Sequence, residues 1–138
     1  MVLRRNQGNP DSRPHLHSRP MGALADVATA LVALLHLAFL VLEMFLWTKP
    51  LGLKVFRNTR EKAEITKVLA ANQGLYNGFL AAGLAWGLMA GMQEIKVFFL
   101  ACVIAAGVYG AWSVNRRILW VQAAPAAVAL GLLLAASA

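Results

Sequence analysis

Three residues that can hydrogen-bond or exchange protons recur at intervals of seven in the first apolar stretch: Thr29, His36 and Glu43. Seven residues of α-helix turn the side chain by only about 20°, so these three share one helix face. Ionisable side chains are expensive inside a membrane and mark functional sites by default. The spacing therefore predicts that Glu43 is a charged anchor or proton site, with His36 as its partner.

A second polar group lies between positions 72 and 77. Helical rotation puts Asn72 and Tyr76 on one face of the second apolar segment, and Gln73 and Asn77 on the opposite face. Tyr109 in the third segment and Gln122 in the fourth lie at a similar depth. We therefore predict a ligand-binding set that comprises His36, Glu43, Asn72, Gln73, Tyr76, Asn77, Tyr109 and Gln122.

Two other interpretations fit the same residues. Hydrogen bonds between membrane helices contribute about 0.6 kcal/mol each, so the cluster could serve only to stabilise the bundle. A less favoured hypothesis is a membrane enzyme that uses Glu43 and His36 as acid and base. The chain contains no phosphate-binding, zinc-protease or hydrolase motif, and the single Cys102 with three scattered histidines gives no metal-ligand spacing. We expect no enzymatic activity, no cofactor and no metal.

The elements that position these residues follow from composition. Of the 138 residues, 59% are hydrophobic and 14% are charged, whereas soluble domains average about 45–50% apolar and about 25% charged. Four apolar runs are each long enough to cross about 30 Å of hydrocarbon as helices. Pro50 ends the first run, and Asn58 with Glu61 resembles a capping box before the second. The prediction is an all-α, four-span integral membrane bundle over residues 21–138, with helices at about 22–47, 60–91, 95–113 and 118–137.

The cations predict the orientation. Eight lysines and arginines lie in the first and third connections, whereas the second connection carries only Lys96. The positive-inside rule then places the first and third connections in the cytoplasm and both termini outside the plasma (inner) membrane. The net charge of +7 is thus explained by topology, and we expect no nucleic-acid partner.

Residues 1–20 disagree with this pattern, because they add four arginines to the outer side. With three prolines and almost nothing to bury, they are predicted to form a disordered polar tail. Met21 is an alternative start of the native protein.

The depth of the polar residues predicts a function. They gather in the cytoplasmic half of the four helices, while the outer halves are almost wholly apolar. A bundle with these groups turned inward would enclose a polar cavity that opens to the cytoplasm. The leading hypothesis is a protein that binds or transports a small polar or amphipathic molecule.

Small residues predict how the helices pack. G-x-x-x-G patterns on two opposed faces of the second helix favour close neighbours on both sides. The second helix is therefore predicted to be central. A homodimer through the glycine-lined faces is the predicted protein contact; those faces carry Gly74, Gly78, Gly83, Gly87 and Gly91.

Three segments also resemble a known family: HLAFLVLEMFLWTKP (36–50), NQGLYNGFLAAGL (72–84) and AAGVYGAWSVNRRILWVQAAPA (105–126). The chain from 21 to 138 is similar to small four-helix bacterial inner-membrane proteins known only as a domain of unknown function, and NQGLYNG is the most specific stretch. The resemblance implies a multi-pass plasma-membrane protein and supplies no activity, substrate or cofactor. It points to the same polar positions that rotation and depth select.

Overall fold

The computed structural model of this chain describes residues 18–138, and these residues form an all-α fold, as predicted. Residues 1–17 of the predicted disordered tail lie outside the described residues, and the first helix already begins at Ser18. The elements in chain order are α1 (Ser18–Met44), α2 (Pro50–Phe56), α3 (Arg60–Met89), α4 (Gln93–Ser113), the π-helix η1 (Leu119–Ala123) and α5 (Ala124–Ala135).

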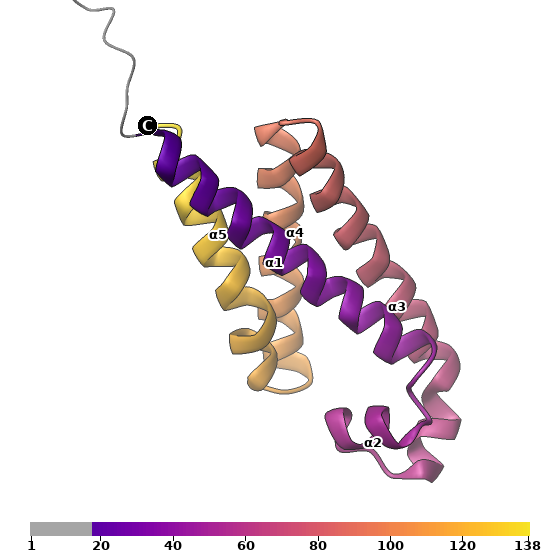
Figure 1. The fold of residues 1–138 in the computed structure, drawn as a ribbon. Helices are drawn as coiled ribbons and strands as arrows, with labels where there is room; N and C mark the ends of the chain where they lie inside the picture. The colour runs from indigo at the N-terminus through magenta and orange to yellow at the C-terminus, as the bar shows by residue number, and fades with distance from the viewer. Residues whose placement is uncertain (1–17) are drawn as a thin grey trace, which may run out of the picture.

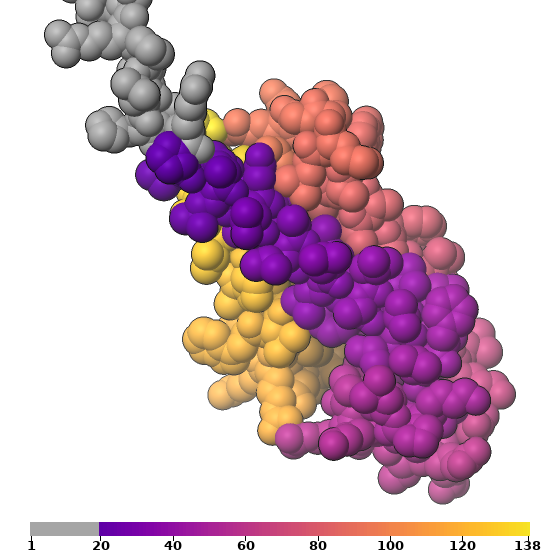
Figure 2. Space-filling model, in the orientation of Figure 1, coloured from indigo at the N-terminus to yellow at the C-terminus, as the bar shows by residue number. Residues whose placement is uncertain are grey.

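Four of these elements form a bundle in which each long helix has two neighbours. α1 packs between α3 and α5, and α4 packs against α3 and against α5 with η1 (Figure 1). The shared core includes Val32, Leu84, Leu100, Val103 and Leu133. α1 lies along the face shown in Figure 2, with α5 on one side and α3 and α4 on the other. The start of α1 and the C-terminus lie at the same end of the bundle (Figure 1).

Two helices, Pro20–Met44 and Gln93–Ser113, are long and apolar enough to cross a membrane. The sequence had predicted four such helices. α3 has 30 residues, but its charged first turns and its side-chain amides reduce its hydropathy. The last apolar helix, Leu119–Ala135, is shorter.

The connection after α1 contains a helix that the sequence analysis did not predict. α1 ends at Met44, and Pro50 then starts α2 at a position where a missing N–H costs nothing. The predicted capping residue of α3 was also wrong by one position. The cap is Thr59, whose Oγ1 accepts from the Lys62 backbone N–H at 3.3 Å.

The last segment is distorted next to its proline. The backbone N–H of Ala124 donates to the carbonyl oxygen of Leu119, a π-type step of five residues. Pro125 follows directly and has no N–H to donate. The predicted 118–137 helix is therefore a π-helix joined to an α-helix.

Glycines allow α3 to contact neighbours on two sides, as predicted, but α1, α4 and α5 also have two neighbours each, so α3 is not more central than they are. A Cβ at Gly74 would lie 2.8 Å from a side-chain carbon of α1, and one at Gly87 would lie 2.8 Å from a side-chain carbon of α4. Gly78 likewise packs on α1, and Gly83 on α4. These four glycines are covered by the chain's own helices, so a homodimer would need a different surface; Gly91, at φ +64°, lies in the following turn.

α2 is held tightly against the end of α1. Gly52 is buried, and a Cβ there would overlap the backbone carbonyl oxygen of Leu46. The rings of Trp47 and Phe56 lie 4.6 Å apart, and the Trp47 Nε1–H donates to Thr66 Oγ1 at 3.1 Å. These contacts fix α2 and the preceding connection to α3.

Substitution of Gly52 by alanine should therefore displace α2. We expect a loss of about 1–3 kcal/mol in unfolding free energy, the usual cost of overpacking. Thermal unfolding in detergent and limited proteolysis of residues 45–59 would measure it. Gly131→Ala is the matched control, because a Cβ at Gly131 meets nothing within 4 Å. Equal stability of the two variants would contradict the packing described here.

Candidate functional site

The stripe predicted on α1 faces the bundle interior. Thr29 and His36 are 0% exposed and Glu43 is 5% exposed. Thr29 Oγ1 donates to the Ala25 carbonyl oxygen at 2.8 Å, and His36 Nδ1 donates to the Val32 carbonyl oxygen at 2.8 Å. Two members of the stripe thus bond to α1 itself, and only Glu43 reaches another helix.

Glu43 joins α1 to α3 through both carboxylate oxygens. Oε1 accepts from Gln73 Nε2 at 3.1 Å, and Oε2 accepts from Asn77 Nδ2 at 2.7 Å. Gly74 lies between these two amides, and a Cβ there would be 3.0 Å from Glu43 Cβ. The short interhelical distance at this glycine brings the amides within reach of the carboxylate.

The predicted pairing of His36 with Glu43 is not formed. Seven residues of helix separate them by about 10 Å along the axis. The Nε2 atom of His36 is buried and has no hydrogen-bond partner within residues 18–138. Its ring instead lies edge-on to Phe39, with centroids 5.7 Å apart.

Beside Glu43 the surface is hollowed by a pocket of about 340 Å³. It lies between the end of α1, the connection that follows, and α3. Its lining has one acid, one base, one hydroxyl and one indole among apolar side chains: Glu43, Met44, Phe45, Trp47, Thr48, Lys67, Val68 and Ala71. An acceptor-only carboxylate and a donor-only ammonium in an otherwise mostly apolar wall suit a small molecule that has both polar and apolar parts.

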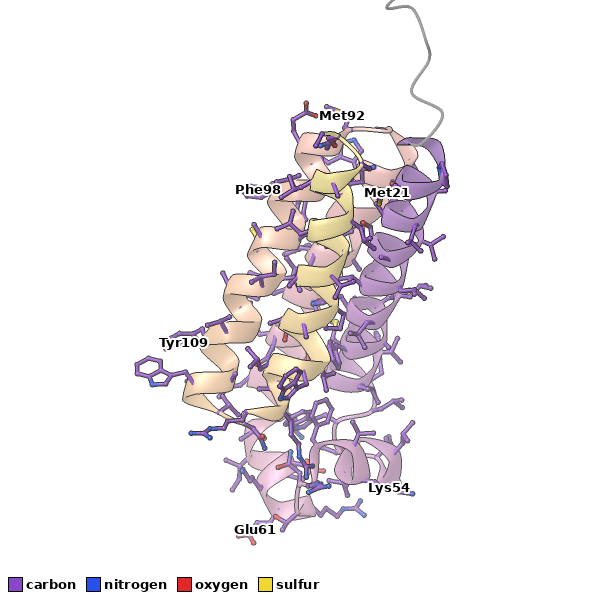
Figure 3. The ribbon with its side chains drawn as sticks, turned by 90° about the vertical axis from the view of Figure 1, so that its left-hand side faces the viewer. Met21, Lys54, Glu61, Met92, Phe98 and Tyr109 are labelled. Atoms are coloured by element: carbon purple, nitrogen blue, oxygen red, sulfur yellow. The ribbon has the colours of Figure 1, made fainter. Side chains whose placement is uncertain are left out.

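The other predicted site residues do not line this pocket. Tyr76 and Tyr109 are 60% and 65% exposed, and Figure 3 shows Tyr109 directed away from the bundle. Asn72 is also exposed, and Gln122 is half-buried in η1. α3 and α4 diverge from the connection at residues 90–92 (Figure 1), so the face of α3 that carries Asn72 and Tyr76 is left uncovered.

Of the residues that line the pocket, sequence reasoning had predicted only Glu43, and it had counted Lys67 among the topological cations. Lys67 and Ala71 lie seven and three residues before Gly74, so helical rotation could have placed them on the face of α3 that meets α1. The turn at 45–48, which follows the end of α1, had no sequence signal.

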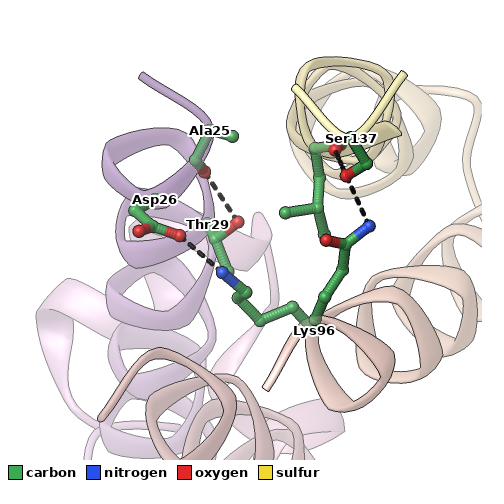
Figure 4. A network of polar contacts seen from close by, with 7 residues as sticks. Ala25, Asp26, Thr29, Lys96 and Ser137 are labelled. Carbon is green, nitrogen blue, oxygen red and sulfur yellow. Dashed lines mark hydrogen bonds and ion pairs between the residues drawn. The ribbon is translucent and has the colours of Figure 1, made fainter. Parts of the chain in front are cut away.

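A second polar cluster ties the opposite end of the bundle together (Figure 4). Lys96 Nζ lies 2.7 Å from Asp26 Oδ1, and the Lys96 side chain is 9% exposed. Gln93 Nε2 donates to Ser137 Oγ at 2.6 Å. Lys96 is thus a buried residue of α4 and not the free connection cation that the sequence analysis counted.

Removal of the Glu43 carboxylate should destabilise the α1–α3 contact. Glu43→Leu leaves the buried Asn77 amide without an acceptor, which we expect to cost about 1–3 kcal/mol. The double variant Glu43→Leu/Asn77→Leu should recover part of that loss, since neither polar group remains. Thermal unfolding in detergent measures both, with the exposed Glu61→Gln as control within about 0.5 kcal/mol of wild type. Additive losses in the double variant would refute the pairing.

Comparison with known proteins places this chain in a family. It is 29% identical over 114 residues to the uncharacterized protein YpaA of Lactococcus lactis subsp. lactis (strain IL1403), a match that covers 80% of this chain and 96% of that protein. No solved structure matches it. The model of the family described as protein of unknown function (DUF1304) matches residues 30–134, which include α3, α4, Glu43 and the pocket lining. The resemblance noted in the sequence is thereby confirmed, and the chain belongs to the DUF1304 family.

Proposed function

We propose that this protein crosses the plasma membrane four times and binds a small polar or amphipathic molecule in the pocket beside Glu43. The observation that carries the proposal is the buried carboxylate in the lining of a pocket of about 340 Å³. Small-molecule sites typically combine apolar walls with a few placed polar groups, and this pocket has that composition.

The outer surface supports a membrane location. Each of the long helices has large hydrophobic side chains that are 40–84% exposed, including Leu31 of α1, Met89 of α3, Phe98 of α4 and Val128 of α5. Soluble monomers rarely expose contiguous apolar surface on this scale. The common location of the α1 start and the C-terminus favours an even number of crossings (Figure 1).

The distribution of charge supports the orientation. Lys54 and Glu61 lie at the end of the bundle opposite Met21 and Met92 (Figure 3). The cations of α2, of the start of α3 and of the α4–η1 connection lie in connections predicted to be cytoplasmic. In this orientation the pocket lies toward the cytoplasmic side, and both termini lie outside. Transport across the membrane would in addition need a second copy of the chain, since four helices are few for a carrier.

The structural hypothesis also has an observation in its favour. Both oxygens of Glu43 already accept hydrogen bonds from α3, so the carboxylate is an interhelical link whether or not a ligand binds. In that case the pocket would have no occupant, and the outer faces of the helices would contact another membrane protein. A catalytic role for Glu43 and His36 has less support, because the two side chains do not contact each other.

Topology is tested by cysteine labelling in a Cys102→Ser background. With the α2 end in the cytoplasm, a membrane-impermeant maleimide should label Met92→Cys in intact cells and Lys54→Cys only after permeabilisation. The reverse pattern would invert the orientation. Labelling of both positions in intact cells would contradict a spanning bundle.

Ligand binding is tested by blocking the pocket. Ala71→Trp fills space in the lining, whereas Ala82→Trp places the same side chain on an exposed position of α3. Native mass spectrometry of protein released from detergent should show a small amphiphile retained by wild type and Ala82→Trp and lost from Ala71→Trp. Wild-type spectra without any retained molecule, together with a large stability loss in Glu43→Gln, would support the structural hypothesis instead.

A further inference from the structure

The inner part of the pocket can accept hydrogen bonds but offers few donors to a ligand. Glu43 is its only acid, and each carboxylate oxygen already takes one amide hydrogen. A carboxylate has about four acceptor positions, so a ligand can still donate to it. An ammonium group offers both the donors and the opposite charge, which makes it the best complement to Glu43.

The rim of the pocket carries a positive charge and hydrogen-bond donors. Lys67 is the only cation in the lining, and its Nζ pairs with Glu64 Oε2 at 3.1 Å. The side chains of this pair are 58% and 46% exposed, and exposed ion pairs are worth only about 0–1 kcal/mol. An anionic group on a ligand can therefore compete with Glu64 for Lys67.

The pocket is also continuous with the apolar outer surface. Phe45 and Val68 belong to the lining and are 63% and 74% exposed. In the proposed orientation this surface faces lipid at the cytoplasmic edge of the bilayer. An alkyl chain attached to a bound head group can leave the pocket across these two side chains without entering water.

Resting on the proposed function, we infer that the occupant is a zwitterionic amphiphile, with an ammonium at Glu43, a phosphate at Lys67 and an alkyl chain along Phe45 and Val68. The shared polar chemistry is that of phosphoethanolamine, which could come from a lipid or from a free metabolite. The pocket, at about 340 Å³, is at the lower end of the range for small-molecule sites. It suits a head group, not a whole lipid.

The experiment compares four probes on the purified full-length chain in detergent: lysophosphatidylethanolamine, lysophosphatidylcholine, lysophosphatidylglycerol and free phosphoethanolamine. Binding is followed by microscale thermophoresis. Wild type should prefer the ethanolamine lipid over the glycerol lipid by about ten-fold or more, since a charge-assisted hydrogen bond is lost in the latter. The choline lipid, which has charge but no N–H donor, should lie between them. Free phosphoethanolamine should bind most weakly.

Two substitutions assign the groups. Glu43→Gln should remove the preference for ethanolamine over glycerol, and Lys67→Gln should weaken all three lysolipids by a similar factor. Glu61→Gln and Lys62→Gln are the matched controls, because both residues are exposed on α3 and neither lines the pocket. Both controls should bind as wild type does.

Equal affinity for the ethanolamine and glycerol lipids, or a preference that survives in Glu43→Gln, would overturn the zwitterion assignment. If free phosphoethanolamine binds as tightly as its lysolipid, the amphiphile assignment fails and a soluble zwitterion replaces it. Ala71→Trp separates this proposal from the previous one. If wild type shows no head-group preference but Ala71→Trp loses all binding, the zwitterion assignment fails and the proposed binding function of the pocket stands. If Ala71→Trp binds every probe as wild type does, both proposals fail.

Discussion

The close approach of α1 and α3 is the constraint on which the rest of the structure depends. At Gly74 a Cβ would lie 3.2 Å from the backbone oxygen of Leu40 and 3.0 Å from Glu43 Cβ, so a side chain here would force the two helices slightly apart. This contact brings the Gln73 and Asn77 amides to the Glu43 carboxylate. Because a buried carboxylate needs hydrogen-bond donors in place of water, the glycine and the amides act together at this contact.

The same packing explains the different character of the two ends. Near Gly87, α3 contacts α4, where Lys96 is buried and pairs with Asp26 of α1. At this end Lys96 and Asp26 neutralise each other, and one side-chain hydrogen bond, from Gln93 to Ser137, connects α4 to the residues at the C-terminus. At the other end, α3 extends past the bundle and carries exposed charges of both signs, including the Lys67–Glu64 pair. The pocket lies at that end, where the turn before α2 contacts α3 through Trp47.

The two walls of the pocket are positioned by different contacts. The α1–α3 contact positions Glu43, and the turn at 45–48, held by Gly52 and by the Trp47 contacts, positions the other wall. Glu43 therefore belongs both to the α1–α3 contact and to the lining of the pocket. This dual role explains why one carboxylate supports both a structural and a ligand-binding interpretation, and why stability and binding must be measured on the same variants.

The helical class, the approximate helix bounds, the buried face of α1 and the two glycine faces of α3 could be predicted from the sequence, because the period of apolar, polar and small residues shows which of them share a helix face. The sequence did not predict α2, the burial of Lys96 or the outward directions of Asn72, Tyr76 and Tyr109. The helical period shows which residues of one helix share a face. It does not show which neighbouring helix covers that face at each position along the axis. Which neighbour covers each face depends on the tertiary structure, because the divergence of α3 from α4 and the fold of residues 45–59 result from contacts between segments far apart in the chain.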